Sequence, residues 1–156
     1  MIATKKLVLF LLSVSLSSCV YSLIPVMPDT LQQHVYDQEK PVIVLAYAHW
    51  CTVCEITRGF LDNIYPQFEH RAVFAMLEVN QNPEFAIKYT VNLIPTFLVF
   101  YHGQLVCEHK GFIQPYKLRS HIELFLSKIE QKQVLDEPFK ISEITENYTT
   151  SMPSES

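Results

Sequence analysis

Two cysteines separated by two residues, Cys51 and Cys54, constrain this chain more than any other feature of its sequence. The stretch before them, 41–48, is a β-branched and aromatic run that is typical of a buried strand. After them, residues 55–68 carry apolar side chains at helical spacing. The cysteines therefore fall where a strand ends and a helix begins. There, free backbone N–H groups and the helix dipole stabilise a thiolate, the attacking group of disulfide exchange.

Hydrophobic periodicity and turn residues divide the remaining chain into short alternating elements. In chain order we predict a helix over 31–38 capped by Asp29 and Thr30, the strand 41–48, the helix 55–68, a strand over 72–79, a helix over 84–89, strands over 96–101 and 105–110, and a helix opened by Pro115. Gly59 and Pro66 predict a bend or an early end in the helix after the cysteines. The last two strands form an antiparallel hairpin and the first two a parallel pair. The predicted fold class is α/β, with a central mixed sheet flanked by helices.

Composition limits the classes of function that the chain can have. Its 156 residues indicate one domain, large enough to bury a core without structural disulfides. Hydrophobic residues make up 49% and only three residues are glycine, so we expect a globular centre rather than a disordered chain. The formal net charge is −4 and no basic block occurs, which argues against nucleic acid as the main partner.

The N-terminal residues have the features of an export signal. Lys5 and Lys6 precede an apolar run over 7–16, and small residues follow. The stretch 16–19 resembles the bacterial lipoprotein box, whose cysteine, here Cys19, would be lipidated. We therefore expect a signal peptide that ends near this cysteine and a domain that lies outside the cytoplasm, where cysteine pairs tend to oxidise.

An uncleaved membrane anchor is the alternative, because no charged residue occurs over 7–28. A spanning helix needs about 20 such residues, and two prolines limit this one. The predicted organisation is a signal peptide over 1–19, a tether over 20–28 with a possible edge strand, a domain over 29–131 and a flexible acidic and polar tail over 132–156.

The order of these elements resembles the thioredoxin family, and local motifs agree with it. The matching stretches are Trp50-Cys51-Thr52-Val53-Cys54, like the family's Trp-Cys-x-x-Cys site; Asn80-Gln81-Asn82-Pro83 followed by Lys88-Tyr89, like its central segment; Ile94-Pro95-Thr96, like its cis-proline loop; and Gly103 and Gly111, at its hairpin turn and substrate-side glycine. The resemblance covers roughly residues 29–130. It implies a thioredoxin-like fold and a thiol:disulfide oxidoreductase with a redox-active centre.

The resemblance also implies roles for individual residues. Cys51 would be the exposed nucleophile, Cys54 would resolve the mixed disulfide, and the two would form the Cys51–Cys54 disulfide. Pro95, if cis, would place the backbone of Ile94 to pair with an extended substrate strand. The implied substrate-binding residues are Trp50, Thr52, Val53, Ile94, Pro95 and Gly111.

Two departures from the family's pattern concern the chemistry of the cysteines. The family's buried aspartate and lysine are replaced by Leu45 and Met76, so the proton of Cys54 has to go to water, to Glu78 or to the substrate thiolate. The dipeptide between the cysteines contains no histidine, which would stabilise the thiolate and make the disulfide oxidising. We therefore predict a reducing potential.

Other readings of the same residues stay open. A CxxC pair can be half of a zinc site, but zinc needs four ligands, and the nearest further candidates are Cys107 and His109. Cys107 lies inside a predicted strand and is either a small buried hydrophobe or a third redox thiol. His49 either tunes Cys51 or points into solvent.

The expected function is a dithiol reductase of the bacterial periplasm that contributes to cell redox homeostasis. It would act on disulfide-bonded envelope proteins without a bound cofactor or metal, receive electrons from a membrane thiol relay, and be a monomer. A disulfide oxidase or isomerase is the nearest alternative. A non-catalytic, lipid-anchored module with a structural disulfide is the alternative from another class.

Overall fold

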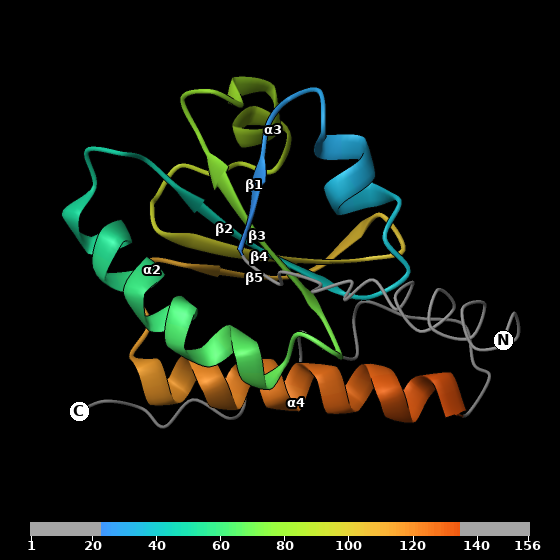
Figure 1. The fold of residues 1–156 in the computed structure, drawn as a ribbon. Coiled ribbons are helices and arrows are strands. Elements are labelled where there is room, and N and C mark those ends of the chain that lie inside the picture. Colours follow the sequence, from blue (N-terminus) through green and yellow to red (C-terminus); the bar gives the residue numbers. More distant parts are fainter. Residues whose placement is uncertain (1–22, 135–156) are drawn as a thin grey trace, which may run out of the picture.

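Residues 23–134 are described by the computed structural model, in which a mixed sheet lies between two layers of helices (Figure 1). The strands are β1 (Ile24–Val26), β2 (Val42–Tyr47), β3 (Val73–Glu78), β4 (Thr96–Tyr101) and β5 (Gln104–Lys110). The helical elements are the π-helical η1 (Gln32–Tyr36), α2 (Thr52–Ile64), the 3-10 turn η2 (Tyr65–Gln67), α3 (Pro83–Lys88) and α4 (Pro115–Val134). The predicted α/β class with a mixed sheet is confirmed.

The order of strands in the sheet is β1-β3-β2-β4-β5, with β2 at its centre. β3 runs parallel to β1 and β2, whereas β4 runs antiparallel to β2 and β5. Because β2 and β4 are antiparallel, the end of β2 lies beside the start of β4, and Ala46 is paired with Thr96. The segments 48–54 and 93–95 therefore meet at one edge of the sheet.

Each face of the sheet supports a separate core, which explains why β2 is apolar at nearly every position. Ile43 and Leu45 face α2 and α4 and belong to a cluster that includes Phe125. Val44 and its alternating neighbours face η1 and α3, where Phe85 packs. Side chains alternate along a strand, so a strand covered on both faces has no polar side.

Three predicted boundaries are corrected by the structure. Ile24–Val26 pairs in parallel with β3, so the domain begins before residue 29, and the 20–28 stretch contains the edge strand that was one possibility for it. Thr30 does not cap η1; its hydroxyl accepts from the N–H of Met27 instead. α4 continues to Val134, beyond the predicted boundary at 131.

The helix after the cysteines starts earlier than predicted, and it has the early end that was one of the two outcomes predicted from Gly59 and Pro66. It begins at Thr52, passes through Gly59 without a break, and ends at Ile64. Pro66 then lies in the short η2, because a proline cannot continue the hydrogen bonding of an α-helix.

The predicted signal peptide with Cys19, and most of the predicted tail, lie outside the described residues. Across positions 23–134, no helix has both the length and the apolar character that crossing a membrane requires.

Candidate functional site

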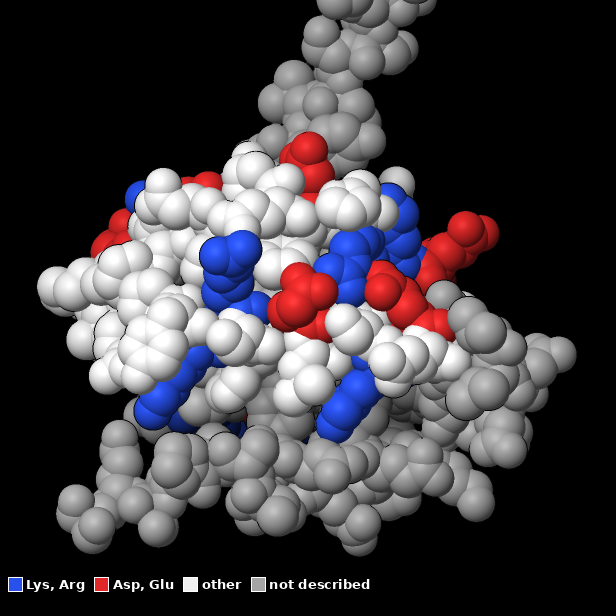
Figure 2. All heavy atoms as spheres, turned by 90° about the horizontal axis from the view of Figure 1, so that it is seen from below, with Lys and Arg blue, Asp and Glu red and all other residues white. Residues whose placement is uncertain are grey.

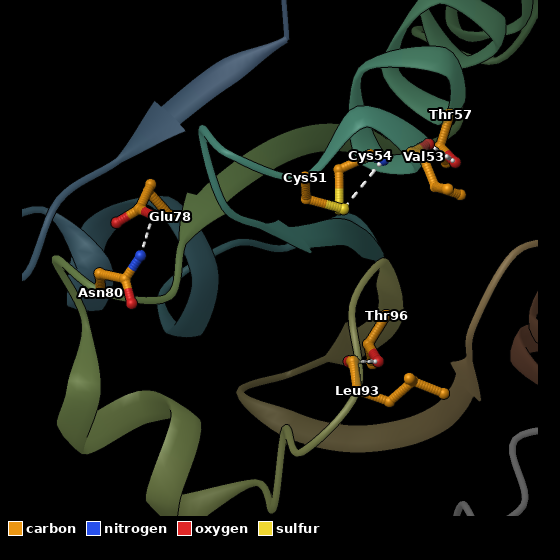
Figure 3. The surroundings of a disulfide bond; sticks show 8 residues. All are labelled: Cys51, Val53, Cys54, Thr57, Glu78, Asn80, Leu93 and Thr96. Carbon is orange, nitrogen blue, oxygen red and sulfur yellow. Dashed lines mark hydrogen bonds between the residues drawn. A yellow bond between two sulfur atoms is a disulfide. The ribbon is translucent and has the colours of Figure 1, made fainter.

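The two cysteines form a disulfide at the N-terminus of α2, with 5.2 Å between their Cα atoms. Cys51 is the N-cap residue in an extended conformation, and its sulfur accepts a hydrogen bond of 3.1 Å from the N–H of Cys54 (Figure 3). The same N–H also donates to the carbonyl of Cys51 at 3.0 Å, so it is shared between the carbonyl and the sulfur. The backbone is therefore arranged to stabilise negative charge on the Cys51 sulfur once the disulfide is reduced.

The two sulfur-bearing side chains differ in their access to solvent. Cys51 is 8% exposed and Cys54 is 1% exposed. Cys51 is thus less accessible than the predicted exposed nucleophile, although it is the more accessible member of the pair. The difference suits the predicted order of attack, with Cys51 meeting the substrate and Cys54 acting from below.

The proline loop lies opposite the disulfide, as predicted. The Ile94–Pro95 peptide bond is cis, and Ile94 packs against the small buried cluster of Ala48 and the two cysteines. The hydroxyl of Thr96 donates to the carbonyl of Leu93 at 2.6 Å, which closes the loop tightly (Figure 3). The Gly111 N–H donates to the carbonyl of Pro95 at 2.8 Å.

The predicted substrate-binding residues form a rim of graded exposure around the disulfide. Trp50 is 73% exposed and Val53 is 43% exposed, and Thr52 is also exposed. Ile94 and Gly111 are half-buried, and Pro95 is buried. Gly111 has a φ of +92° and lies next to Leu93, so a side chain there would be strained.

No acid lies below the cysteines where the family's pattern has one. Leu45 and Met76 are paired in register on β2 and β3, and Leu45 is fully buried in the core. Glu78 is a buried carboxylate, 5% exposed, but its two oxygens accept from the side chain of Asn80 and the N–H of Gln81. Figure 3 shows the Glu78 carboxyl group turned toward Asn80.

Tyr47 connects this carboxylate with the cysteine end of β2. It pairs in register with Glu78 and packs against the cysteine cluster. Burial raises the pKa of the Tyr47 phenol, and the negative charges of Glu78 and Glu55 raise it further. The phenol therefore stays neutral beside the disulfide at ordinary pH.

The remaining candidates make no hydrogen bond with the disulfide among the contacts of the described residues. His49 is exposed, with its ring 5.4 Å from that of Tyr47. Cys107 is partly buried against the main core and, with His109 and His121, lines a cavity of about 40 Å³ between β5 and α4. Among residues 23–134 no three His, Cys, Asp or Glu side chains are grouped so that they could hold a metal ion.

Sequence reasoning missed three exposed apolar residues beside the rim: Ile56 and Phe112, each 48% exposed, and Leu93, 52% exposed. A signal for them was present in the sequence. Ile56 lies three residues after Val53, and Phe112 follows the rim residue Gly111 directly.

A cysteine pair at a strand-to-helix junction, faced by a cis-proline loop on a five-stranded mixed sheet, defines the class of thiol:disulfide oxidoreductases. A family model described as Thioredoxin matches residues 22–124. The chain belongs to the thioredoxin family and has the disulfide oxidoreductase site of that family.

Several curated thioredoxins are similar to the chain. It is 30% identical to thioredoxin of Buchnera aphidicola subsp. Baizongia pistaciae over 95 residues, which are 61% of this chain and 87% of the relative. It is 32% identical to thioredoxin of Synechocystis sp. over 97 residues, 62% of this chain and 91% of the relative. It is 30% identical to mitochondrial thioredoxin of Mus musculus over 102 residues, 65% of this chain and 58% of the relative.

Proposed function

We propose that the chain is a protein-disulfide reductase of the bacterial periplasm. The observation that carries the direction of the reaction is the environment of Cys51. Its sulfur accepts one N–H, from Cys54, and neither Thr52 nor Val53 offers a cationic donor. A thiolate that is stabilised by a helix terminus without an imidazolium gives a disulfide that is harder to reduce, and hence a dithiol that donates electrons.

In the proposed reaction the Cys51 thiolate attacks one sulfur of a substrate disulfide and forms a mixed disulfide with it. The other substrate sulfur leaves as a thiolate and takes up a proton from solvent. Cys54 then attacks Cys51, which forms the internal disulfide and releases the second substrate sulfur. In this proposal that sulfur takes up the Cys54 proton. Two electrons pass from the dithiol to the substrate.

The location and the partners of the protein are part of the same proposal. Lys5, Lys6 and the apolar run 7–16 support export, and Cys19 is the proposed site of lipidation. The substrates are disulfide-bonded envelope proteins, and a membrane thiol relay supplies the electrons because the compartment is oxidising.

The deciding experiment is the equilibrium redox potential of the Cys51–Cys54 couple in glutathione and dithiothreitol buffers. A potential near about −270 mV is expected for a reductase. A potential of about −120 mV would indicate that the protein is a disulfide oxidase instead. A disulfide that these buffers do not reduce would indicate a non-catalytic module with a structural disulfide.

Activity and location have separate tests. The protein should accelerate the reduction of insulin by dithiothreitol. Cys51→Ser should abolish this acceleration, and Cys107→Ser should leave it unchanged. In bacterial cells that produce the full chain, fractionation should find it at the membrane, and Cys19→Ser should prevent lipidation. A protein that stays in the cytoplasmic fraction would overturn the proposed location but not the activity.

A further inference from the structure

A small cavity of about 40 Å³ lies in the core between β5 and α4. In Figure 1, α4 runs together with α2 along the lower face of the molecule, and the cavity lies between α4 and the sheet. Most of its walls are apolar and include Phe97 and Ile122. The other lining residues are Cys107, His109 and His121. The proposed function uses none of these three side chains, so their presence in one cavity needs a separate explanation.

The strand β5 contributes a thiol and an imidazole to the cavity. Cys107 is paired with Val99 and His109 with Phe97, so the two side chains lie on the same face of the sheet. Cys107 is a thiol and not half of a disulfide, and it is partly buried against the main core. The Nε2 atom of His109 is buried and has no hydrogen-bond partner within residues 23–134. A buried polar atom without a partner costs free energy, and this one can take up a proton.

His121 supplies a second imidazole from the facing helix. Its ring centre lies 6.3 Å from that of His109. Burial lowers the pKa of His121, and the positive charges of His109 and Lys117 lower it further. At ordinary pH this neighbour therefore places no positive charge beside His109 that would oppose proton uptake there. A thiol in apolar surroundings is unreactive until a base removes its proton, and an imidazole is the usual base near neutral pH.

The volume of the cavity limits what can react in it. An ordered water needs roughly 10–15 Å³ of cavity volume, so this cavity has room for a molecule of only a few heavy atoms. Hydrogen peroxide has two oxygen atoms, each with a hydrogen-bond donor and acceptor, and agrees with this size and with the imidazoles. Glutathione disulfide and aromatic hydroperoxides are much larger. The single oxygen atom that a sulfenic acid adds to a cysteine sulfur also fits.

We propose that Cys107 is a second reactive thiol of the protein, which hydrogen peroxide oxidises to a sulfenic acid in this cavity with His109 as the base. The Cys107 proton passes to Nε2 of His109, and the thiolate sulfur attacks one peroxide oxygen. A sulfur–oxygen bond forms, the oxygen–oxygen bond breaks, and the leaving hydroxide takes the proton from His109 and departs as water. Two electrons pass from the sulfur to the peroxide. The reaction is independent of the Cys51–Cys54 couple.

The test uses the full-length protein with its Cys51–Cys54 disulfide intact, so that neither of these sulfurs can react as a thiol. Hydrogen peroxide is added with dimedone, which traps sulfenic acids, and peptide mass spectrometry follows the label at Cys107. Labelling should be about tenfold faster than that of free cysteine at pH 7, since an ordinary thiol is only a few per cent thiolate there. His109→Gln should remove this advantage. His70→Gln, at an exposed histidine outside the cavity, should keep it.

Two further measurements test the role of the cavity itself. Val99→Ile adds one carbon atom to its wall and keeps both imidazoles, so it should slow the labelling of Cys107 while circular dichroism shows the same fold. Cumene hydroperoxide, which carries an aromatic ring, should label Cys107 far more slowly than hydrogen peroxide does. Absence of label at Cys107, equal rates in wild type and His109→Gln, or equal rates with the two peroxides would each overturn the proposal.

Discussion

Single residues decide how strongly the Cys51 sulfur holds its charge. The hydrogen bond from the Cys54 N–H is part of the backbone and survives substitution of side chains. Val53 stands between the cysteines, is exposed, and offers no donor to the sulfur. The identity of this residue is therefore the simplest means of changing the potential while the fold is kept.

Val53→His should make the couple more oxidising by roughly 30 mV or more, which corresponds to about tenfold in the equilibrium with glutathione. An imidazolium beside Cys51 stabilises the thiolate and hence the reduced form. The measurement is the equilibrium potential, with Val53→Leu as the control for size. A potential that stays at the wild-type value would contradict our account of the Thr52-Val53 dipeptide.

Gly59 has a helical backbone conformation that any L-amino acid other than proline adopts easily. It lies inside α2, and a side chain built on it would meet nothing within 4 Å. Gly59→Ala should raise the free energy of unfolding by about 0.5–1 kcal/mol, because alanine loses less backbone entropy in a helix. Urea denaturation measures the change. Gly111→Ala is the contrasting variant and should destabilise by about 1 kcal/mol or more, since φ is +92° there.

At the scale of elements, one arginine connects the segment before β3 with the last helix. Arg71 donates through Nε and Nη2 to both oxygens of Glu130 and through Nη1 to Glu123, at 2.7 to 3.1 Å. Its side chain is 18% exposed, so solvent screens these ion pairs less than it screens the open pair of Arg58 and Glu55. Figure 2 shows acidic and basic side chains side by side on this lower face.

Arg71→Met should lower the free energy of unfolding by about 1–2 kcal/mol, because it removes three charge-assisted hydrogen bonds and leaves the apolar part of the side chain. Arg58→Met is the matched control and should cost about 0.5 kcal/mol or less. Urea denaturation at low and high salt measures both. Equal effects of the two substitutions would show that Arg71 does not hold the segment to α4.

At the scale of the whole molecule, acid should weaken the fold through the packing of β5 against α4. His121 on α4 has its ring 6.3 Å from that of His109 on β5, and both line the cavity that Cys107 also lines. Burial lowers the pKa of His121, and the positive charges of His109 and Lys117 lower it further. The His121 imidazole therefore binds a proton at a lower pH in the folded protein than in the unfolded chain, where its pKa is the ordinary histidine value of about 6.5.

The contribution of His121 to stability is present above pH 6.5 and is lost as the pH falls below it, since the unfolded state then binds more protons. Thermal unfolding between pH 7.5 and 5 should show the melting temperature falling, and His121→Gln should reduce the fall. His70→Gln, a change at an exposed residue, is the control. A pH dependence that is the same in both variants and wild type would exclude His121 as its source.

Most of the fold could be predicted from the sequence because the hydrophobic periodicity and the positions of the turn residues indicate the same element boundaries. The strands around residues 43, 75 and 98 were placed within one residue at each end, since apolar runs bounded by turns leave little choice. The cysteine pair was recognised from its spacing, and the proline loop from its resemblance to that of the thioredoxin family. β1 was uncertain because a three-residue edge strand acquires its structure from pairing with β3 and not from its own pattern.

The parts that were missed depend on distance in space. That Glu78 is engaged by Asn80 and Gln81 follows from a turn whose geometry no pattern encodes. That Phe112 meets Phe60 follows from packing between elements far apart in the chain. Local patterns carry no information on such pairs, so the electrostatics and the outer surface of the site had to come from the structure.

The antiparallel pairing of β2 with β4 has a consequence for when the protein is reactive. Cys51 and the loop at Pro95 come from the end of one strand and the start of the other, and Ala46–Thr96 is the pair that brings them together. A chain in which β4 has separated still possesses both thiols but lacks the surface that receives a substrate. Proteolytic nicking or local opening of β4 would thus silence the protein without a change at either cysteine, so activity reports on the integrity of the whole sheet.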